Sequence, residues 1–350
     1  MKIVLGLSGG VDSAVSARLL QKQGHEVIGA TILTGFGADA EPEARALAAS
    51  LGIPFVPVDV SAAFREEVVA RFADDYLSGR TPNPCVLCNP RIKWQALVSV
   101  ADSLGADCVA TGHYSEIVRL ENGRYAVKKA PWKDQSYVLY GLSQEMLART
   151  VTVLSGLTKE QVREIAASEH LPVAAKPDSQ EICFIPDNDH AGFIRRLMGD
   201  AAGAGLFPGK FVDLDGNVLG DHQGLLRYTV GQRKGLGIAL GEPRFVVELR
   251  PETNEVVLGR DEDCYAIGLT ANGLVFQGLD PAELASGPVR LLGKIRYAHR
   301  EEPCEVSLTP DGGLFCQFDA PQRAITPGQA VVFYRDDAVA LGGTITRVIR

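Results

Sequence analysis

The sequence predicts an α/β N-terminal half, built on a doubly wound parallel sheet, followed by two small all-β domains. From residue 2 to about residue 171, short β-branched runs alternate with stretches of helical periodicity. This alternation is typical of a parallel sheet that helices cover on both faces. Beyond residue 199, short alternating strands follow one another, separated by turns rich in Gly, Pro and Asp-Gly. That pattern favours small barrels or sandwiches.

The N-terminal half is expected to alternate strand and helix. Strands are expected at 2–7, 26–33, 54–60 and 106–113, and helices at 12–24, 41–52, 63–78, 91–104 and 158–171, with a loop at 79–90. Gly24 and Gly52 are suited to end helices, and Pro42 suits a first helical turn. Because ligands of such sheets bind at the carboxyl ends of strands, "SGGVDS" (8–13) and "TGHY" (111–114) are expected to face one cleft.

The composition changes near residue 200, where "DAAGAGLFPG" has the character of a linker. We therefore expect three domains, at 1–198, 199–264 and 265–350. The apolar stretches are only strand-length, and the N-terminus turns polar too early for a signal peptide, so we expect a cytoplasmic protein without a membrane span. An odd count of seven cysteines in 350 residues also argues against a disulfide framework.

Charge alone disfavours a nucleic-acid partner, because the formal net charge is −8. The charge is uneven, however. Basic residues are interleaved with aromatic ones in four stretches, at 91–94, 128–133, 227–234 and 290–300. Such stretches are more often a solvated surface than a binding surface, but four of them in an acidic chain weaken that interpretation.

The loop after the first strand has the residue pattern of a phosphate cradle, a loop whose backbone N–H groups surround a bound phosphate. In "GLSGGVDS" (6–13), Gly9 and Gly10 allow the backbone to approach an anion, and Ser8 and Ser13 offer hydroxyl donors. The helix that follows would point its positive N-terminus at the same anion. There is no GK[ST] sequence and therefore no P-loop lysine. This suggests a site that holds the pyrophosphate end of ATP and transfers the adenylyl group.

Three cysteines stand out from the others. Cys85 and Cys88 form the single CxxC, in "TPNPCVLCNPR", and Cys183 lies in the polar, proline-bounded loop "KPDSQEICFIPD". A structural zinc site would need four ligands, whereas the remaining cysteines (108, 264, 304 and 316) are expected to be core residues. Working thiols beside an adenylating loop suggest sulfur transfer, with Lys133, Lys176 or Arg91 as candidate activating cations.

Further motifs then appear in a characteristic order: "GRTPNPCVLCNPRIKW", "ATGHY", "KDQSYVLY", "DSQEICFIP", "HQGLLRYTVGQRKGLGI", "RYAHREEPC" and "TPGQAVVFY". Together with the first loop, they make the chain similar to the bacterial tRNA-specific 2-thiouridylases over nearly its whole length. These enzymes are PP-loop ATP pyrophosphatases with an adenine nucleotide α-hydrolase-like fold. The resemblance implies ATP-dependent 2-thiolation of the wobble uridine, position 34, of tRNA, with ATP and Mg²⁺ as cofactors.

The resemblance also implies a role for each matching residue. Cys88 would be the nucleophile that frees sulfur, Cys183 would carry the persulfide, and Cys85 would lie beside them. The implied ATP contacts are Gly6, Leu7, Ser8, Gly9, Gly10, Val11, Asp12, Ser13, Ile32 and Gly112. The implied tRNA contacts are Asn83, Pro84, Cys85, His113, Lys133, Asp134, Gln135, Arg296, Tyr297 and Gln329. The implied partners are tRNAs for Glu, Gln and Lys, and a sulfur donor such as a cysteine desulfurase or a sulfur-relay protein.

Two departures from the family pattern leave alternatives open. Many members have an aspartate at the position of Cys85, so the three thiols could instead hold a [4Fe–4S] cluster with an open iron. The segment after the second strand, "TGFGADAEPEAR", is also shorter than in many members. The rival functions are another adenylating PP-loop synthetase, a sulfur transferase acting on another base, and a non-enzymatic ATP-sensing module that binds tRNA or protein.

Overall fold

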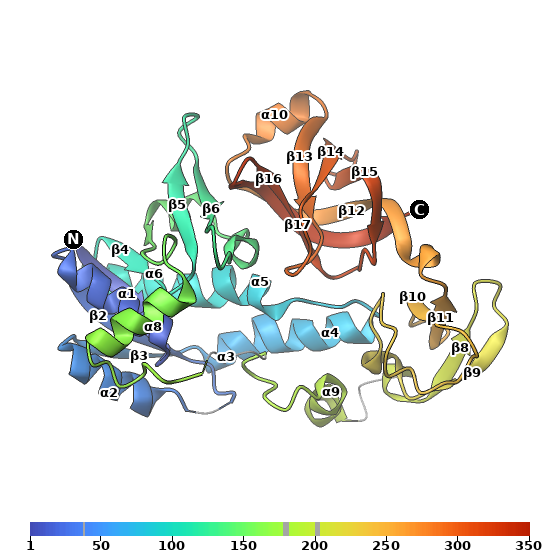
Figure 1. Cartoon of the computed structure of the whole chain (residues 1–350), viewed down its shortest axis with the longest axis horizontal. Helices are drawn as coiled ribbons and strands as arrows, with labels where there is room; N and C mark the ends of the chain where they lie inside the picture. Colours follow the sequence, from blue (N-terminus) through green and yellow to red (C-terminus); the bar gives the residue numbers. More distant parts are fainter. Residues whose placement is uncertain (38, 178–181, 200–203) are drawn as a thin grey trace.

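The N-terminal half contains a five-stranded parallel sheet in the order β3-β2-β1-β4-β7 (Figure 1). A computed structural model describes residues 1–37, 39–177, 182–199 and 204–350. The strands are β1 (Lys2–Gly6), β2 (Glu26–Leu33), β3 (Phe55–Asp59), β4 (Cys108–Ala110) and β7 (Thr150–Val151). The first four strands confirm the predicted sheet, and β7 adds an edge strand that the sequence did not suggest.

Helices cover both faces of this sheet, as a doubly wound fold requires. The alternation within β1 divides the two cores: Ile3 and Leu5 pack with helices α1 and α8, whereas Val4 packs with α6. Their bounds, with those of the other helices here, are α1 (Val11–Lys22), α2 (Glu41–Leu51), α3 (Ser61–Phe64), α4 (Arg71–Leu77), α6 (Trp94–Ser103), α7 (Gln144–Ala148), α8 (Lys159–Ser168) and α9 (His190–Met198). A π-helical segment, Arg65–Ala70, joins α3 to α4.

The expected loop at 79–90 is partly helical. Helix α5 (Pro84–Cys88) begins there and continues through a π-helical turn, Asn89–Lys93, into α6. Asn83 caps α5 because its Oδ1 accepts a hydrogen bond from the Cys85 backbone N–H at 3.2 Å, and Pro84 occupies the first helical position. A proline is tolerated at that position because its missing N–H would have no intrahelical partner.

The C-terminal half contains two further sheets. The central sheet has the order β10-β11-β8-β9, and the larger sheet has the order β12-β15-β14-β13-β16-β17-β6-β5, with β12 also pairing β17. The strands are β8 (Gly209–Val212), β9 (Val218–His222), β10 (Phe245–Arg250), β11 (Glu255–Gly259), β12 (Tyr265–Phe276), β13 (Val289–Lys294), β14 (Glu302–Leu308), β15 (Leu314–Arg323), β16 (Ala330–Arg335) and β17 (Ala338–Ile349). The pairing of β12 with β15 and with β17 closes a barrel that carries helix α10 (Pro281–Ser286). The all-β character predicted for this half is confirmed.

A hairpin from the N-terminal half joins the barrel sheet. Strands β5 (Ser115–Arg119) and β6 (Tyr125–Lys129) rise from the catalytic half beside the barrel (Figure 1), and β6 pairs β17 through Lys128 and Ala338. The boundaries at 198 and 264 remain predictions, but catalytic half and barrel share this sheet. Over the described ranges, no helix is long and apolar enough to cross a membrane.

Candidate active site

The first β–α loop forms the expected cradle at the carboxyl end of β1, beside β4, where the strand order changes direction. Ser13 organises the loop: its Oγ accepts a hydrogen bond from the Ser8 N–H at 3.2 Å and donates to the Gly10 carbonyl at 3.0 Å. Gly9 has a φ of +70°, which favours glycine. Gly10, the N-cap of α1, has no side chain to cap the helix, so the first N–H groups of α1 are available to an anion.

Cations surround the Asp12 carboxylate beside this loop. Its Oδ1 accepts hydrogen bonds from Lys159 Nζ at 2.6 Å and from the Tyr114 hydroxyl at 2.7 Å. Lys133 Nζ lies 3.9 Å from Oδ2 and sits over the Tyr114 ring, 4.8 Å from its centroid. On the other side of the loop, Lys176 Nζ donates to the Gly9 carbonyl at 3.1 Å. The cradle therefore has lysines at its edge although the P-loop lysine is missing from the sequence.

The family resemblance implies that Asp12 and Ser13 help to hold the nucleotide and its Mg²⁺, and the contacts of Asp12 bear on that expectation. A Mg²⁺ site needs free oxygen donors around an octahedron, but the Asp12 oxygens are directed at two lysines and a hydroxyl. Among the described residues, no group of three or more His, Cys, Asp or Glu is placed to hold a metal ion. The residues around Asp12 do not fit a bound Mg²⁺ in this conformation, and Asp12 here positions cations instead.

The segment after β4 connects the cradle to the cysteines. A side chain on Gly112 would place Cβ 2.9 Å from both the carbonyl carbon of Asp12 and the N of Ser13, so only glycine allows this contact. His113 follows; its ring packs 5.6 Å from that of Trp94, and its Nδ1 lies 2.9 Å from Thr111 Oγ1. Burial, aided by the charge of Lys93, lowers the pKa of His113 to about 3, so its imidazole is neutral at pH 7. The two predicted loops are therefore in direct contact at the carboxyl ends of β1 and β4.

The three singled-out cysteines come together around Lys93. Cys88 is buried in a core that also contains Phe184 and Ile185, which follow Cys183 directly. Burial acts to lower the pKa of Lys93, but the nearby thiolates of Cys88, Cys85 and Cys183 outweigh burial and raise it. Burial raises the pKa of the Cys88 thiol to about 11, and Lys93 opposes this shift. Desolvation also raises the pKa of Cys183, again opposed by Lys93.

The structure gives a different activating cation from those the sequence suggested. Arg91 is paired with Glu67 at 2.8 Å, Lys176 is paired with Glu43, and Lys133 lies at Asp12. Lys93, one turn beyond Cys88 on the same continuous helix, is the cation that acts on the thiols. Cys85 and Cys183 are exposed, and all seven cysteines are free thiols. The other four pack as expected, with Cys264, Cys304 and Cys316 buried and Cys108 half-buried.

The short segment after β2 lies against the backbone of Cys183. A Cβ on Gly37 would lie 2.8 Å from the Cys183 carbonyl oxygen, and the Phe36 ring lies 6.4 Å from that of Phe184. Ile32, at the end of β2, packs against the same core. The 178–181 part of the cysteine loop lies outside the described residues.

Several residues predicted to contact RNA meet where the catalytic half touches the barrel. The Tyr297 hydroxyl donates to the Asp134 carbonyl at 3.1 Å, and the Asp134 carboxylate lies 3.9 Å from Lys294. Gln135 is turned inward, because its Oε1 accepts a hydrogen bond from the Tyr114 N–H at 2.8 Å. Gln329 Nε2 donates to the Thr81 carbonyl at 2.7 Å, which brings the barrel to the start of α5.

Sequence reasoning missed three residues of this site: Lys93, Tyr114 and Lys159. Lys159 lies in the helix after β7, and its side chain is only 16% exposed at Asp12. Its distance in sequence from the first loop gave no signal. Tyr114 and Lys93 stood inside quoted motifs, "TGHY" and "NPRIKW", and could have been singled out.

Three family models match the chain in order. They are described as tRNA methyl transferase HUP domain, tRNA methyl transferase PRC-barrel domain and Aminomethyltransferase beta-barrel domain, and they match residues 1–187, 198–260 and 268–345. A solved structure, the NMN synthetase from Francisella tularensis, is similar at a TM-score of 0.34 with 20% identity, covering 56% of this chain and 76% of that one. That likeness is too weak to bear on function.

Full-length relatives are much closer. The chain is 48% identical to the tRNA-specific 2-thiouridylase MnmA of Lachnoclostridium phytofermentans, with 99% of each chain covered. It is 45% identical to the protein of the same name from Carboxydothermus hydrogenoformans, over 99% of this chain and 98% of that one. It is also 45% identical to the one from Acetivibrio thermocellus, over 98% of this chain and 99% of that one. The chain therefore belongs to the tRNA-specific 2-thiouridylase MnmA family.

Proposed function

We propose that this protein is a tRNA-uridine 2-sulfurtransferase that uses ATP to replace O2 of the wobble uridine, position 34, by sulfur. The observation that carries the proposal is a continuous chain of contacts. The phosphate cradle touches Gly112, His113 follows Gly112, and Lys93 lies near both His113 and the three thiols. This proximity supports a site in which an adenylating loop and sulfur nucleophiles act on the same base.

The ATP half of the reaction is supported by the cradle. The backbone N–H groups at the start of α1 and the lysines near Asp12 would hold the phosphates of ATP. In the proposed step, O2 of the uridine attacks the α-phosphorus, an O–P bond forms, and pyrophosphate leaves with the electrons of the broken bond. The adenylated O2 is then a good leaving group.

The sulfur half is supported by the exposed Cys183 and the buried Cys88. A donor protein, such as a cysteine desulfurase or sulfur-relay protein, would load Cys183 with a persulfide, for which an exposed thiol is suitable. The terminal sulfur attacks C2 and AMP departs. The Cys88 thiolate attacks Cys183 Sγ and breaks the persulfide S–S bond, so a Cys88–Cys183 disulfide forms, which an external thiol then reduces. Lys93 favours the thiolate form.

The proposed binding of tRNA is supported by residues on both sides of the junction between the catalytic half and the barrel. Because the reactive atom must leave the base stack, the uridine would be flipped into the cleft. Asn83, Pro84 and Cys85 at the start of α5 would contact it, with Lys133, Asp134, Arg296, Tyr297 and Gln329 around the anticodon loop. His113 and Gln135 are inward-facing, so we propose that they shape the cleft rather than contact phosphate.

The test is ATP-dependent 2-thiouridine formation on tRNA, read by mass spectrometry of the nucleosides. Cys88→Ser and Cys183→Ser are each expected to abolish thiolation while leaving tRNA affinity unchanged. The matched control is Cys264→Ser, a buried thiol of the central region. Full activity in either catalytic variant would contradict its role.

The cluster alternative is distinguished by iron. In that alternative Cys85, Cys88 and Cys183 would be the cluster ligands, whereas the persulfide route uses Cys183 and Cys88 as reacting thiols. Protein that is prepared anaerobically without iron is expected to thiolate tRNA with a persulfide donor. Activity that appears only after iron and sulfide are supplied would overturn the persulfide route without removing the tRNA substrate.

A further inference from the structure

The central region presents a cluster of exposed cations that the active site does not use. Arg227, Arg233 and Lys234, within "RYTVGQRK", are all exposed, and none of their charged groups has an ion-pair or hydrogen-bond partner among the described residues. Other cations nearby are paired instead: Lys210 with Asp221 at 2.6 Å, and Arg250 with Glu248 at 3.2 Å. In a chain of net charge −8, positive charge without an internal partner is a local feature that can attract an external anion.

The segment that carries these cations is held in a defined shape. Gln232 fixes the turn, because its Oε1 accepts from the Thr229 N–H at 3.0 Å and its Nε2 donates to the Lys234 carbonyl at 3.0 Å. Two backbone bonds then join the turn to Val246 in β10: Gly231 N–H donates to its carbonyl at 2.8 Å, and Val246 N–H donates to the Gln232 carbonyl at 3.0 Å. The loop that carries the cations is therefore already ordered. Binding a partner would cost it little further conformational entropy.

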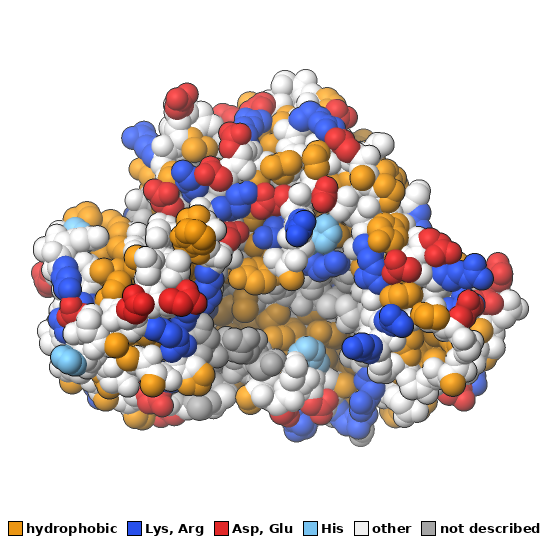
Figure 2. Space-filling view, viewed as in Figure 1, with side chains coloured by type: hydrophobic (Ala, Val, Ile, Leu, Met, Phe, Trp, Pro, Cys, Tyr) orange, Lys and Arg blue, Asp and Glu red, His pale blue; other side chains and the backbone are white. Residues whose placement is uncertain are grey.

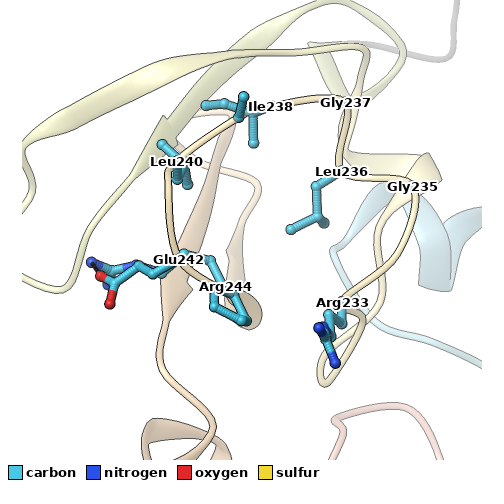
Figure 3. Close-up of a pocket in the computed structure, with 10 residues that line it drawn as sticks. Arg233, Gly235, Leu236, Gly237, Ile238, Leu240, Glu242 and Arg244 are labelled. Atoms are coloured by element: carbon cyan, nitrogen blue, oxygen red, sulfur yellow. Dashed lines mark hydrogen bonds and ion pairs between the residues drawn. The ribbon is translucent and has the colours of Figure 1, made fainter.

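An open groove of about 460 Å³ lies within this loop, between residues 233 and 244. Figure 3 shows the chain curving around it, with Arg233 at its edge, Leu236 pointing into it, and Glu242 pointing away on the opposite side. The Glu242 carboxylate is paired with Arg244 at 2.5 Å. The carboxylate nearest the groove is thus neutralised, which leaves Arg233 and Lys234 to set the sign of the local potential.

The cation cluster is continuous with the predicted RNA-contacting part of the barrel. A Cβ on Gly231 would lie 2.6 Å from Ala324 Cβ, so the loop packs directly on the barrel there. Arg296 Nη1 donates to the carbonyls of Arg323 and Ala324 at 3.2 Å each, at the same corner. In the space-filling view, Lys and Arg side chains gather along the upper and right-hand edges of the central hollow, whereas hydrophobic side chains line its floor (Figure 2).

The other end of the cluster is fixed to the catalytic half. Leu226, next to Arg227, is buried in the core that also holds Ile194 of α9 and Phe72 of α4. The central sheet lies at the opposite end of the molecule from α1 and the phosphate cradle (Figure 1). An RNA that extends from the cysteines toward the central sheet would therefore meet Arg227, Arg233 and Lys234.

We propose that Arg227, Arg233 and Lys234 bind the sugar-phosphate backbone of a double-stranded stem of the tRNA, away from the anticodon loop. This inference rests on the proposed function and adds a second docking surface to it. Phosphates are favoured over bases because the three groups are cations without an exposed aromatic ring among them on which a base could stack. Duplex RNA is bound mainly through phosphate and 2′-hydroxyl contacts, so cations presented by an ordered loop suit a stem.

The test compares two variants with the same change in net charge. One is the triple variant R227Q/R233Q/K234Q, and the matched control is K210Q/R250Q/R260Q, whose cations are paired on the same sheet region. Affinity for full-length tRNA is measured over a range of salt concentrations. For the first variant, the slope of log K against log salt is expected to become shallower by about 2 to 3, since each phosphate contact contributes about 0.7–0.9. The control is expected to keep the wild-type slope.

Thiolation kinetics provide a second readout. The first variant is expected to raise the KM for full-length tRNA at least about tenfold, and the defect should disappear on an isolated anticodon stem-loop, which lacks the distant stem. Equal slopes and KM values for the two variants would overturn the inference while wild-type activity upholds the proposed function. Wild-type protein that neither binds nor thiolates tRNA would overturn both.

Discussion

At the scale of single residues, we infer for Lys159 a role in ATP binding that the sequence did not indicate. Its ammonium lies 2.6 Å from Asp12 Oδ1, beside the open N-terminus of α1, and the side chain is largely buried. A desolvated cation at that place would attract the phosphates of ATP far more strongly than an exposed one. Asp12 then acts as the group that orients it.

Lys159→Met is therefore expected to weaken binding of inorganic pyrophosphate and of ATP at least about tenfold, since a hydrogen bond to a charged group contributes about 1.5–3 kcal/mol. AMP, which lacks the outer phosphates, should bind almost as before. Calorimetric titration of the three ligands measures this, with Lys22→Met, an exposed lysine paired with Glu169, as the control. Unchanged pyrophosphate affinity in Lys159→Met would contradict the assignment.

The Cys88 thiol gives a pH-dependent prediction at the same scale. Burial raises its pKa to about 11, so the thiolate is a small fraction at neutral pH and that fraction grows with pH. Lys93 lowers this pKa, so removing the charge in Lys93→Met is expected to raise the pKa further and to slow alkylation of Cys88 severalfold at pH 9. Mass spectrometry of iodoacetamide labelling between pH 7 and 11 follows this reaction. Lys93→Arg keeps the charge and should retain most of the rate, and equal rates in wild type and Lys93→Met would contradict the role.

At the scale of elements, the sequence predicted the parallel sheet well because its central strands β1 and β2 are buried on both faces. The predicted strands at 2–7 and 26–33 correspond to β1 and β2 almost residue for residue, since a continuous β-branched run has few alternatives. Helix stops at glycine were equally informative: Gly52 is the C-cap of α2 with a φ of 67°. Residues that are close together in the sequence determine these elements, so the sequence alone predicts them.

The sequence did not predict elements whose local residue patterns are compatible with more than one structure, or whose pairing partner is distant. Prolines 82, 84 and 90 suggested a loop, but Asn83 and Pro84 are the cap and first residue of α5, a combination that also predicts a helix start. The β5–β6 hairpin turns at Asn122-Gly123, a strong hairpin signal. Its pairing with the C-terminal strand β17 could not be predicted, because nothing local specifies a partner more than 200 residues away.

The candidate site also contains parts that the sequence predicted and parts that it did not. The cradle and Gly112 could be predicted because each lies at the end of a buried strand, and strand ends of a parallel sheet meet. The proximity of Lys93 to Cys183, and of Lys159 to Asp12, arises from how separate helices and loops pack. Such tertiary proximity has no periodic signature in a single sequence.

At the scale of the whole molecule, one buried glutamine connects the catalytic half to the barrel. Gln277, which is fully buried, donates from Nε2 to the carbonyls of Leu139 and Tyr140 at 3.0 and 2.9 Å, and its Oε1 accepts from the Val127 N–H at 3.0 Å. These partners belong to the catalytic half, whereas Gln277 follows β12 of the barrel. Its side chain therefore satisfies the Tyr140 carbonyl and the Val127 N–H, which would otherwise be buried without hydrogen bonds, and adds a second donor to the Leu139 carbonyl.

Gln277→Leu keeps the volume but leaves those backbone groups unsatisfied, so it is expected to lower the free energy of unfolding by about 3 kcal/mol. Urea unfolding measures this, and Gln317→Leu, at an exposed position of the same barrel, is the control.

Because the barrel also holds Gln329 against Thr81 at the start of α5, loosening the junction should raise the KM for tRNA in folded Gln277→Leu more than it lowers kcat. A stable variant with wild-type KM would show that Gln277 is not needed to hold the two halves in register.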